Sequence, residues 1–356
     1  MNNYIEYNDK IAFHPGYYVK EIIEESGLTQ EDFAKRLDTT PKNLSCLIRG
    51  EQSLSTDIAL KLSRMLGTSV EYWLNLQKNY DGLIAEFQSL EVLEQEKRVF
   101  KYLDYTYFKE QFHLPELPRK IDQQIQNVRE FLKVSTLSVF TKQDMTVSFR
   151  SSGNGMSESN TVRANAMVQI AINQALNVKA PKFNRRKFEK AAEYALTLTM
   201  DHENFIPLIR DAFQDAGVVL IILPNLPGSG INGATKKIGQ NIMLMVNDRR
   251  LYSDTFWFTL FHEIGHIING NYGITFSENQ EKTADRYAED KLIPPESYAR
   301  FTQIGVYTEA SIREFSLSIK RDPGIVLGRL LSDKKVPFSD VLLTRALRHK
   351  YKIFSR

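Results

Sequence analysis

Residues 256–268 read FWFTLFHEIGHII, an apolar run that contains two histidines four positions apart. On a helix, residues four apart share a face, so His262 and His266 point the same way, one turn apart. Two such imidazoles can hold one zinc ion, with the intervening Glu263 placed as the general base. The surrounding apolar residues predict a buried helix, where two unpaired imidazoles would be costly. We therefore favour a metal site over core or surface histidines without metal.

A catalytic zinc site needs a third protein ligand beside a water. The next predicted helix runs over residues 278–291, and Ser277 with Gln280 would form the capping box that opens it. Glu281 and Asp285 are four apart on this helix and share a face. We predict Glu281 as the third metal ligand and Asp285 as the acceptor of a ligating histidine's ring N–H. The competing interpretations are Glu278 as the ligand and Asp285 as a solvated side chain.

Two stretches around these residues resemble the ImmA/IrrE metallopeptidases, namely residues 254–268 (DTFWFTLFHEIGHII) and residues 281–295 (EKTADRYAEDKLIPP). Residues 233–235, 241–247 and 322–330 are also similar to that family. The resemblance implies a zincin-like (gluzincin) fold with zinc on His262, His266 and Glu281. It further implies Glu263 as general base and the cleavage of transcriptional repressors. The chain departs from the family at Thr283, where many members have a second glutamate, and at Asn269, near where many have another histidine.

A second recognisable unit spans residues 14–78. Thr29 would cap one short helix, and Thr40, followed by Pro41, would cap a second that ends at Gly50. Two short helices around such a turn are typical of the helix-turn-helix unit, whose second helix enters the DNA major groove. Apolar residues at helical spacing would form its core: Val19, Ile22, Ile23, Leu28, Phe33, Ala34, Leu37, Leu44, Leu47, Ile58, Ala59, Leu62 and Leu66. The predicted DNA contacts are Gln30, Lys42, Asn43, Ser45 and Arg49.

This unit resembles HigA-like antitoxins of the XRE helix-turn-helix family, most clearly at residues 73–81 (WLNLQKNYD). The resemblance implies operator DNA as a partner and leaves room for a toxin partner. Residues 1–80 hold nine Lys or Arg and eleven Asp or Glu, a net charge of minus two. DNA affinity would therefore depend on the local placement of Gln30, Lys42, Arg49 and Lys61. The alternative is a helix-turn-helix used for dimerisation or partner binding with little DNA contact.

The chain of 356 residues is long enough for two domains and a connector. We expect a helix-turn-helix domain at residues 1–80, a helical connector at 81–135 and a zinc metallopeptidase domain at 136–356. The connector would hold helices over residues 83–110 and 120–133, and a loop would follow at 151–160. Helices at 161–177 and 185–200 and strands at 217–223 and 241–246 complete a mostly helical α+β fold.

The overall net charge of +3 is too small to indicate a partner. A single cysteine, Cys46, excludes an internal disulfide and fits a reducing cytoplasm, and its packing is favoured over redox sensing. No secretion signal or apolar run of membrane-spanning length is visible, so we expect a cytoplasmic protein without membrane contact. The basic segment 332–356 is interpreted as a solvated helix, with nucleic-acid binding as the minority interpretation.

These features predict a homodimeric DNA-binding regulator with a zinc-dependent endopeptidase domain, whose substrate is a repressor or an antitoxin-type protein. The oxyanion donor could be Tyr252, Tyr272, Tyr287 or His202, and the strand at 241–246 could pair with an extended substrate. One alternative is a HigA-like antitoxin or repressor whose zinc domain is a sensor or scaffold without proteolysis. Another is a zinc hydrolase of small amides, which the helix-turn-helix does not support.

Overall fold

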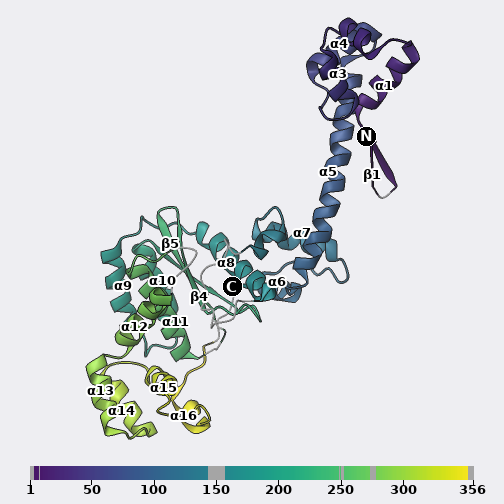
Figure 1. Ribbon diagram of the computed structural model, residues 1–356. Coiled ribbons are helices and arrows are strands. Elements are labelled where there is room, and N and C mark those ends of the chain that lie inside the picture. The colour runs from purple at the N-terminus through teal and green to yellow at the C-terminus, as the bar shows by residue number, and fades with distance from the viewer. Residues whose placement is uncertain are drawn as a thin grey trace. The chain divides into compact units, whose positions relative to one another are not determined.

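The computed structural model describes residues 4–7, 9–142, 157–247, 249, 252–272 and 278–351. This part of the chain is mostly helical with small sheets, and it separates into two compact units at residues 1–95 and 96–356 (Figure 1). The division lies inside the segment predicted as a connector, and the predicted three-domain arrangement stays a prediction. None of the helices described combines the length and the apolar character required to cross a membrane.

The N-terminal unit is a bundle of short helices with a small hairpin. Its elements are β1 (Tyr4–Tyr7), β2 (Lys10–Phe13), α1 (Pro15–Ser26), α2 (Gln30–Arg36), α3 (Pro41–Ile48), α4 (Thr56–Leu66) and the start of α5 (Val70–Phe100). Thr29 and Thr40 accept backbone N–H groups at the starts of α2 and α3, as their positions in the sequence predict. The two short helices of the helix-turn-helix are thereby confirmed.

The core of this unit contains every apolar residue that the helical spacing selects, with Ile22, Leu28 and Leu66 only partly buried. Trp73, on the first turns of α5, is 1% exposed and donates its indole N–H to the Thr68 hydroxyl at 2.8 Å. The hairpin β1–β2 is antiparallel and was not predicted, because strands of four residues give too short a pattern.

The C-terminal unit begins with helices that differ in extent from the predicted connector helices. The observed elements are α6 (Tyr105–Phe112), α7 (Ile121–Leu132), the 3₁₀ helix η1 (Leu137–Thr141), α8 (Glu158–Leu176), α9 (Arg185–Thr197) and α10 (Phe205–Asp215). The prediction of one helix over residues 83–110 is wrong at both ends. Helix α5 already begins at Val70 and ends at Phe100, and α6 begins after it with Asp104 as its N-cap. Helix α8 begins inside the loop predicted at 151–160, and residues 151–156 lie outside the described part.

A three-stranded sheet lies between helices in this unit. The strands are β3 (Val218–Leu223), β4 (Gly233–Ile238) and β5 (Asn241–Asn247), in the order β3-β5-β4. Strand β5 pairs parallel with β3 and antiparallel with β4. Alternate residues of β3 and β5 join a core shared with α9, α10 and the later helices. Helix α8 contacts all three strands, and helices therefore pack against both faces of the sheet.

The remaining helices complete this core. They are α11 (Ser253–Ile268), α12 (Glu278–Leu292), α13 (Pro295–Ile304), α14 (Glu309–Ser318), α15 (Pro323–Ser332) and α16 (Val341–Leu347). Helix α16 confirms a helix in the basic C-terminal segment, and its apolar residues are only partly packed. Val341 and Leu342 are 66% and 81% exposed, whereas Leu347 is buried.

Candidate metal centre and nucleic-acid interface

Helix α11 places both histidines of the HExxH pattern at the edge of the core. Its apolar residues Trp257, Leu260, Phe261 and Ile264 are fully buried, and this burial fixes which way the helix faces. The first turn is held by Arg348, which donates two hydrogen bonds of 2.8 Å to the carboxylate of Asp254. A bidentate ion pair of this kind adds geometric precision as well as energy.

Three side chains from α11 and α12 converge. The Nε2 atoms of His262 and His266 are 3.1 Å apart. The carboxylate oxygens of Glu281 lie 3.3 Å from His262 Nε2 and 3.6 Å from His266 Nε2. All three residues come from the positions that the sequence selects, whereas Glu278 is 81% exposed and forms an ion pair with Lys282. The structure thus brings His262, His266 and Glu281 together and leaves Glu278 outside the group.

The spacing of these donors fits a tetrahedral ion. Two atoms that are each about 2.05 Å from a tetrahedral zinc are roughly 3.3 Å apart. The observed separations of 3.1, 3.3 and 3.6 Å surround this value. Two imidazoles and one carboxylate are also the donor set typical of catalytic zinc sites with an open fourth position. The residues present therefore fit zinc.

Asp285 lies behind the first histidine. Its Oδ1 atom is 3.0 Å from His262 Nδ1, so that the ring N–H at Nδ1 can donate to this carboxylate. The contact orients the ring and leaves Nε2 with a lone pair toward His266 and Glu281. Burial lowers the pKa of His266 to about 4, which keeps this imidazole in the neutral form that a metal requires.

Gly265 sets how closely α11 and α12 approach. A Cβ atom at this position would lie 3.1 Å from the Ala284 Cα atom and 3.2 Å from the Tyr287 side chain. Because Ala284 stands three residues after Glu281, this close approach brings the third donor within reach of the histidines.

Glu263 is buried next to the three donors, with 6% of its surface exposed. Its Oε2 atom accepts a hydrogen bond of 2.6 Å from the hydroxyl of Thr235 on β4. Burial raises the pKa of Glu263 to about 7, although the bond from Thr235 and the nearby His262 act in the opposite direction. A carboxyl group with this pKa can exchange a proton near neutral pH.

Thr235 and Gly233 lie against Glu263, and the residue pattern does not identify either of them. A Cβ on Gly233 would lie 2.7 Å from Glu263 Oε1, so the missing side chain makes room for the glutamate. The single signal for them was the similarity of residues 233–235 to the family segment that precedes the zinc helix.

The strand at 241–246 was predicted to pair with a substrate, and this prediction is wrong. β5 is the middle strand, and its backbone groups are already paired with β3 and β4. Its continuous apolar sequence is typical of a strand buried on both faces. Within the described sheet, β4 is the end strand next to Glu263.

The four oxyanion candidates have different surroundings. Arg348 stacks on the Tyr252 ring at 3.9 Å, and Tyr272 packs against Phe183. Tyr287 lies beside Gly265, and burial raises its pKa to about 12, so that its hydroxyl stays a donor. His202 belongs to a different group of side chains, with Asp322 and His349. Ser277, the predicted cap of α12, lies outside the described residues.

The predicted DNA contacts lie on α2 and α3 of the N-terminal unit. Gln30, Lys42, Asn43 and Arg49 are exposed, and Ser45 is half-buried. Cys46 is also half-buried, beside Arg49. The exposed positions follow from the burial of Leu44, Leu47 and Ile48 on the opposite face of α3.

Two of the cations on this surface are engaged within the unit. Arg49 donates two hydrogen bonds of 2.8 Å to Glu51 and also contacts Ser45. Lys61 forms ion pairs with Asp38 at 3.2 Å and Asp57 at 3.1 Å. Phosphate binding by Arg49 or Lys61 would therefore compete with carboxylates of the same unit.

Comparisons with known proteins match the N-terminal unit. Residues 19–73 match the sequence model described as helix-turn-helix. The uncharacterized HTH-type transcriptional regulator YddM of Escherichia coli (strain K12) is 34% identical over 79 residues, covering 22% of this chain and 84% of that protein. Virulence-associated protein I of Dichelobacter nodosus is 34% identical over 80 residues, covering 22% of this chain and 74% of that protein.

Among solved structures, an addiction module antidote protein of a HigA family from Coxiella burnetii is similar. The two sequences are 30% identical over the matched region, which covers 24% of this chain and 92% of the antidote protein, and the TM-score is 0.22. These similarities confirm the predicted helix-turn-helix unit. The metallopeptidase domain stays a prediction.

Proposed function

Because the chain belongs to the helix-turn-helix family through its N-terminal unit, we propose that it is a DNA-binding transcriptional regulator that also contains a zinc-dependent endopeptidase. The regulator part rests on the exposed residues of α3. The endopeptidase part rests on one observation, the convergence of His262, His266 and Glu281 at the spacing of zinc ligands.

In this proposal His262, His266 and Glu281 hold the ion, and Asp285 orients the ring of His262. When bound, zinc supplies a Lewis acid for the scissile carbonyl and an acidified water. Glu263 takes a proton from the attacking water at its carboxylate and delivers it to the nitrogen of the leaving amine. Thr235, through its hydrogen bond, holds Glu263 in place for this transfer.

An extended substrate fits the end strand of the sheet. β4 pairs with β5 along one side, and its other side is the sheet edge nearest Glu263 in the described chain. Strand addition there would align a peptide with the metal centre. We propose a repressor or antitoxin-type protein as the substrate, since such a protein would couple cleavage to the regulatory unit.

Replacing Glu263 with glutamine tests the endopeptidase. The variant keeps the size of the side chain and an acceptor for Thr235, but it cannot take a proton. We expect Glu263→Gln to retain zinc in elemental analysis and to lose cleavage of the repressor-type and antitoxin-type proteins encoded beside it. Glu296→Gln, an exposed position on α13, is the matched control and should cleave like the wild type. Equal cleavage by wild type and Glu263→Gln would rule out the proposed mechanism.

DNA binding is tested separately with the full chain. Electrophoretic mobility shifts on the DNA upstream of its own gene should weaken in Lys42→Ala and Asn43→Ala, whereas Lys20→Ala, on the exposed surface of α1, should bind like the wild type. A homodimer on two half-sites is the arrangement we expect. If both α3 variants bound DNA as the wild type does, α3 would not be the recognition helix.

The second candidate function is an antitoxin-like repressor in which the metal centre is a sensor or scaffold. The resemblance of residues 14–78 to HigA-like antitoxins favours this candidate and suggests a toxin partner. It predicts unchanged regulation in Glu263→Gln and no proteolysis by either protein, and the same experiment therefore separates the two functions.

A further inference from the structure

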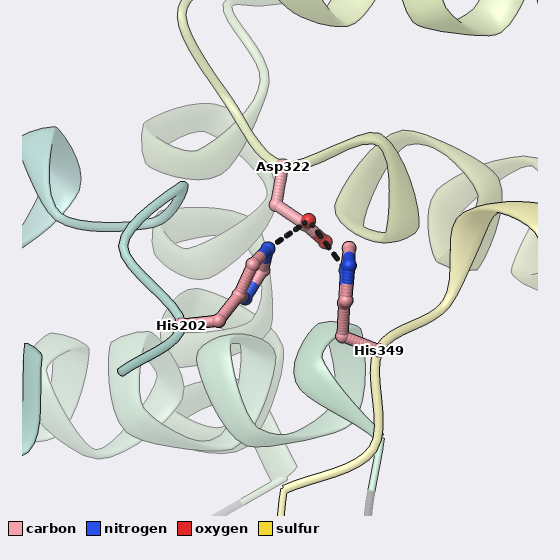
Figure 2. A group of neighbouring side chains, drawn as sticks. All are labelled: His202, Asp322 and His349. Carbon is pink, nitrogen blue, oxygen red and sulfur yellow. Dashed lines mark ion pairs between the residues drawn. The ribbon is translucent and has the colours of Figure 1, made fainter. Parts of the chain in front are cut away.

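A second group of side chains of the types that bind metals lies at the start of α11, apart from the HExxH residues. His202 stands between α9 and α10, Asp322 caps α15, and His349 follows α16 (Figure 2). Their nearest ligand atoms all lie within 4.8 Å of one another. These residues are far apart in the sequence, and no spacing pattern connects them.

The distances in this group match those of the first group. Asp322 Oδ2 lies 3.1 Å from His202 Nε2 and 3.3 Å from His349 Nδ1, and both imidazoles face this one oxygen (Figure 2). Donors about 2.05 Å from a tetrahedral zinc are roughly 3.3 Å apart. An ion between the two rings and the carboxylate would therefore need little movement of the side chains.

Asp322 is fully buried, and its two oxygens have different surroundings. Oδ1 accepts hydrogen bonds from the Ser253 hydroxyl at 3.0 Å and from the Gly324 backbone N–H at 2.9 Å. Oδ2 accepts no hydrogen bond within the described residues, because neither imidazole contact has hydrogen-bond geometry. A buried carboxylate oxygen without a donor is costly, and no Lys or Arg of the described chain forms an ion pair with it. A cation beside Oδ2 would satisfy this oxygen.

The far side of His202 contacts a tyrosine hydroxyl. Its Nδ1 atom is 3.0 Å from the Tyr351 hydroxyl, which also accepts the Trp257 indole N–H at 3.2 Å. In the tautomer whose Nδ1–H donates to this oxygen, the lone pair lies on Nε2, which is the atom that faces Asp322. The rings of His202 and His349 stack with centroids 3.7 Å apart, and two positively charged rings would repel each other there.

We propose that His202, Asp322 and His349 form a second site for a divalent transition metal of the zinc class. Two imidazoles and one carboxylate favour zinc over calcium or magnesium, which prefer oxygen ligands. A pocket of about 220 Å³, lined by Met200, Arg313 and Leu317 among others, adjoins the group and leaves room for water on the ion. The ion would join three distant segments at Ser253, the first residue of α11, and its role is structural.

Zinc binding by the full chain tests this site. After saturation with zinc alone and gel filtration, elemental analysis should give two ions per chain for the wild type and one for His349→Asn. His349 is half exposed, and its replacement is therefore tolerated by the core. His113→Asn is the matched control: His113 is exposed with a φ of 57°, a conformation that asparagine accepts, and it should keep two ions.

A second variant separates this site from the HExxH site. His262→Asn should lose one ion on its own, and His262→Asn with His349→Asn should lose both. Zinc should also raise the Tm of His262→Asn but not that of the double variant. If His349→Asn binds as much zinc as the wild type, and zinc gives His262→Asn and the double variant the same Tm, the group is a histidine–aspartate ion pair and the proposal is wrong. Loss of the HExxH ion alone would leave this inference intact.

Discussion

Replacing Gly233 with alanine should push Glu263 out of its present position. The new Cβ would lie 2.7 Å from Glu263 Oε1, 2.8 Å from its Cγ and 3.0 Å from its Cδ. A Cβ atom essentially never lies less than 3.0 Å from a heavy atom of another residue. The glutamate is buried and held by Thr235, and β4 is paired with β5, so neither side can move without loss of contacts.

The cost follows from these contacts. Overpacking of a buried position costs about 1–3 kcal/mol, and a hydrogen bond between neutral groups contributes about 0.5–1.5 kcal/mol. We therefore expect Gly233→Ala to lower the free energy of unfolding of the C-terminal unit by about 2–4 kcal/mol. In a Glu263→Ala background the clashing atoms are absent, and the same change should cost less than about 1 kcal/mol.

The measurement is a double-mutant cycle by urea denaturation of the metal-free protein. The chain has two tryptophans, one in each unit, and a Trp73→Phe background leaves Trp257 to report on the C-terminal unit. The expected coupling between Gly233 and Glu263 is about 2 kcal/mol or more. An equal cost of Gly233→Ala with and without the glutamate would show that the close approach does not exist.

Three further predictions follow from other contacts. Burial raises the pKa of Glu263 from 4.5 to about 7, so the folded metal-free protein keeps a proton there that the unfolded chain loses. Its free energy of unfolding relative to that of Glu263→Gln should therefore fall by about 3 kcal/mol between pH 4.5 and pH 8. The same difference between the two proteins at both pH values, measured by urea denaturation, would contradict this. Glu51→Gln should release Arg49 from its ion pair and tighten DNA binding by about 3- to 10-fold. Arg49→Ala should weaken DNA binding and reduce the slope of log K against log salt concentration by about one. Binding titrations at several salt concentrations check both predictions. Gly16→Ala would place a Cβ 1.9 Å from the Leu47 carbonyl oxygen. The free energy of unfolding of the N-terminal unit, measured by thermal unfolding, should therefore fall by about 3 kcal/mol or more. An unchanged Tm would contradict the packing of α1 on α3.

Local patterns in the sequence predict local structure well here. The caps Thr29 and Thr40 and the helix that contains His262 and His266 each depend on residues within a few positions of one another. Glu281 and Asp285 were selected because one helical face has to hold both, and the structure places both beside His262.

The parts that were missed depend on pairing across long distances. Whether the strand at 241–247 is central or terminal is decided by β3 and β4, and β4 itself, with Lys236 and Lys237, has no apolar pattern. The group of His202, Asp322 and His349 is assembled by the packing of α15 against α11 and by the bridge between Tyr252 and Lys350, which no spacing in the sequence reveals. The extent of α5 was misjudged because a helix can continue through Gly82 when nothing else interrupts it.

The close approach at Gly265 has a consequence for recognising such centres in other chains. A chain could retain both histidines, the intervening glutamate and the carboxylate on the next helix, and still bind no ion if a bulky residue stood between the histidine pair. The bulky side chain would push the two helices apart, and the carboxylate on the second helix would no longer reach the ion between the histidines. Surveys that count only ligands would score such a chain as competent, and the small residue at this crossing should be part of the criterion.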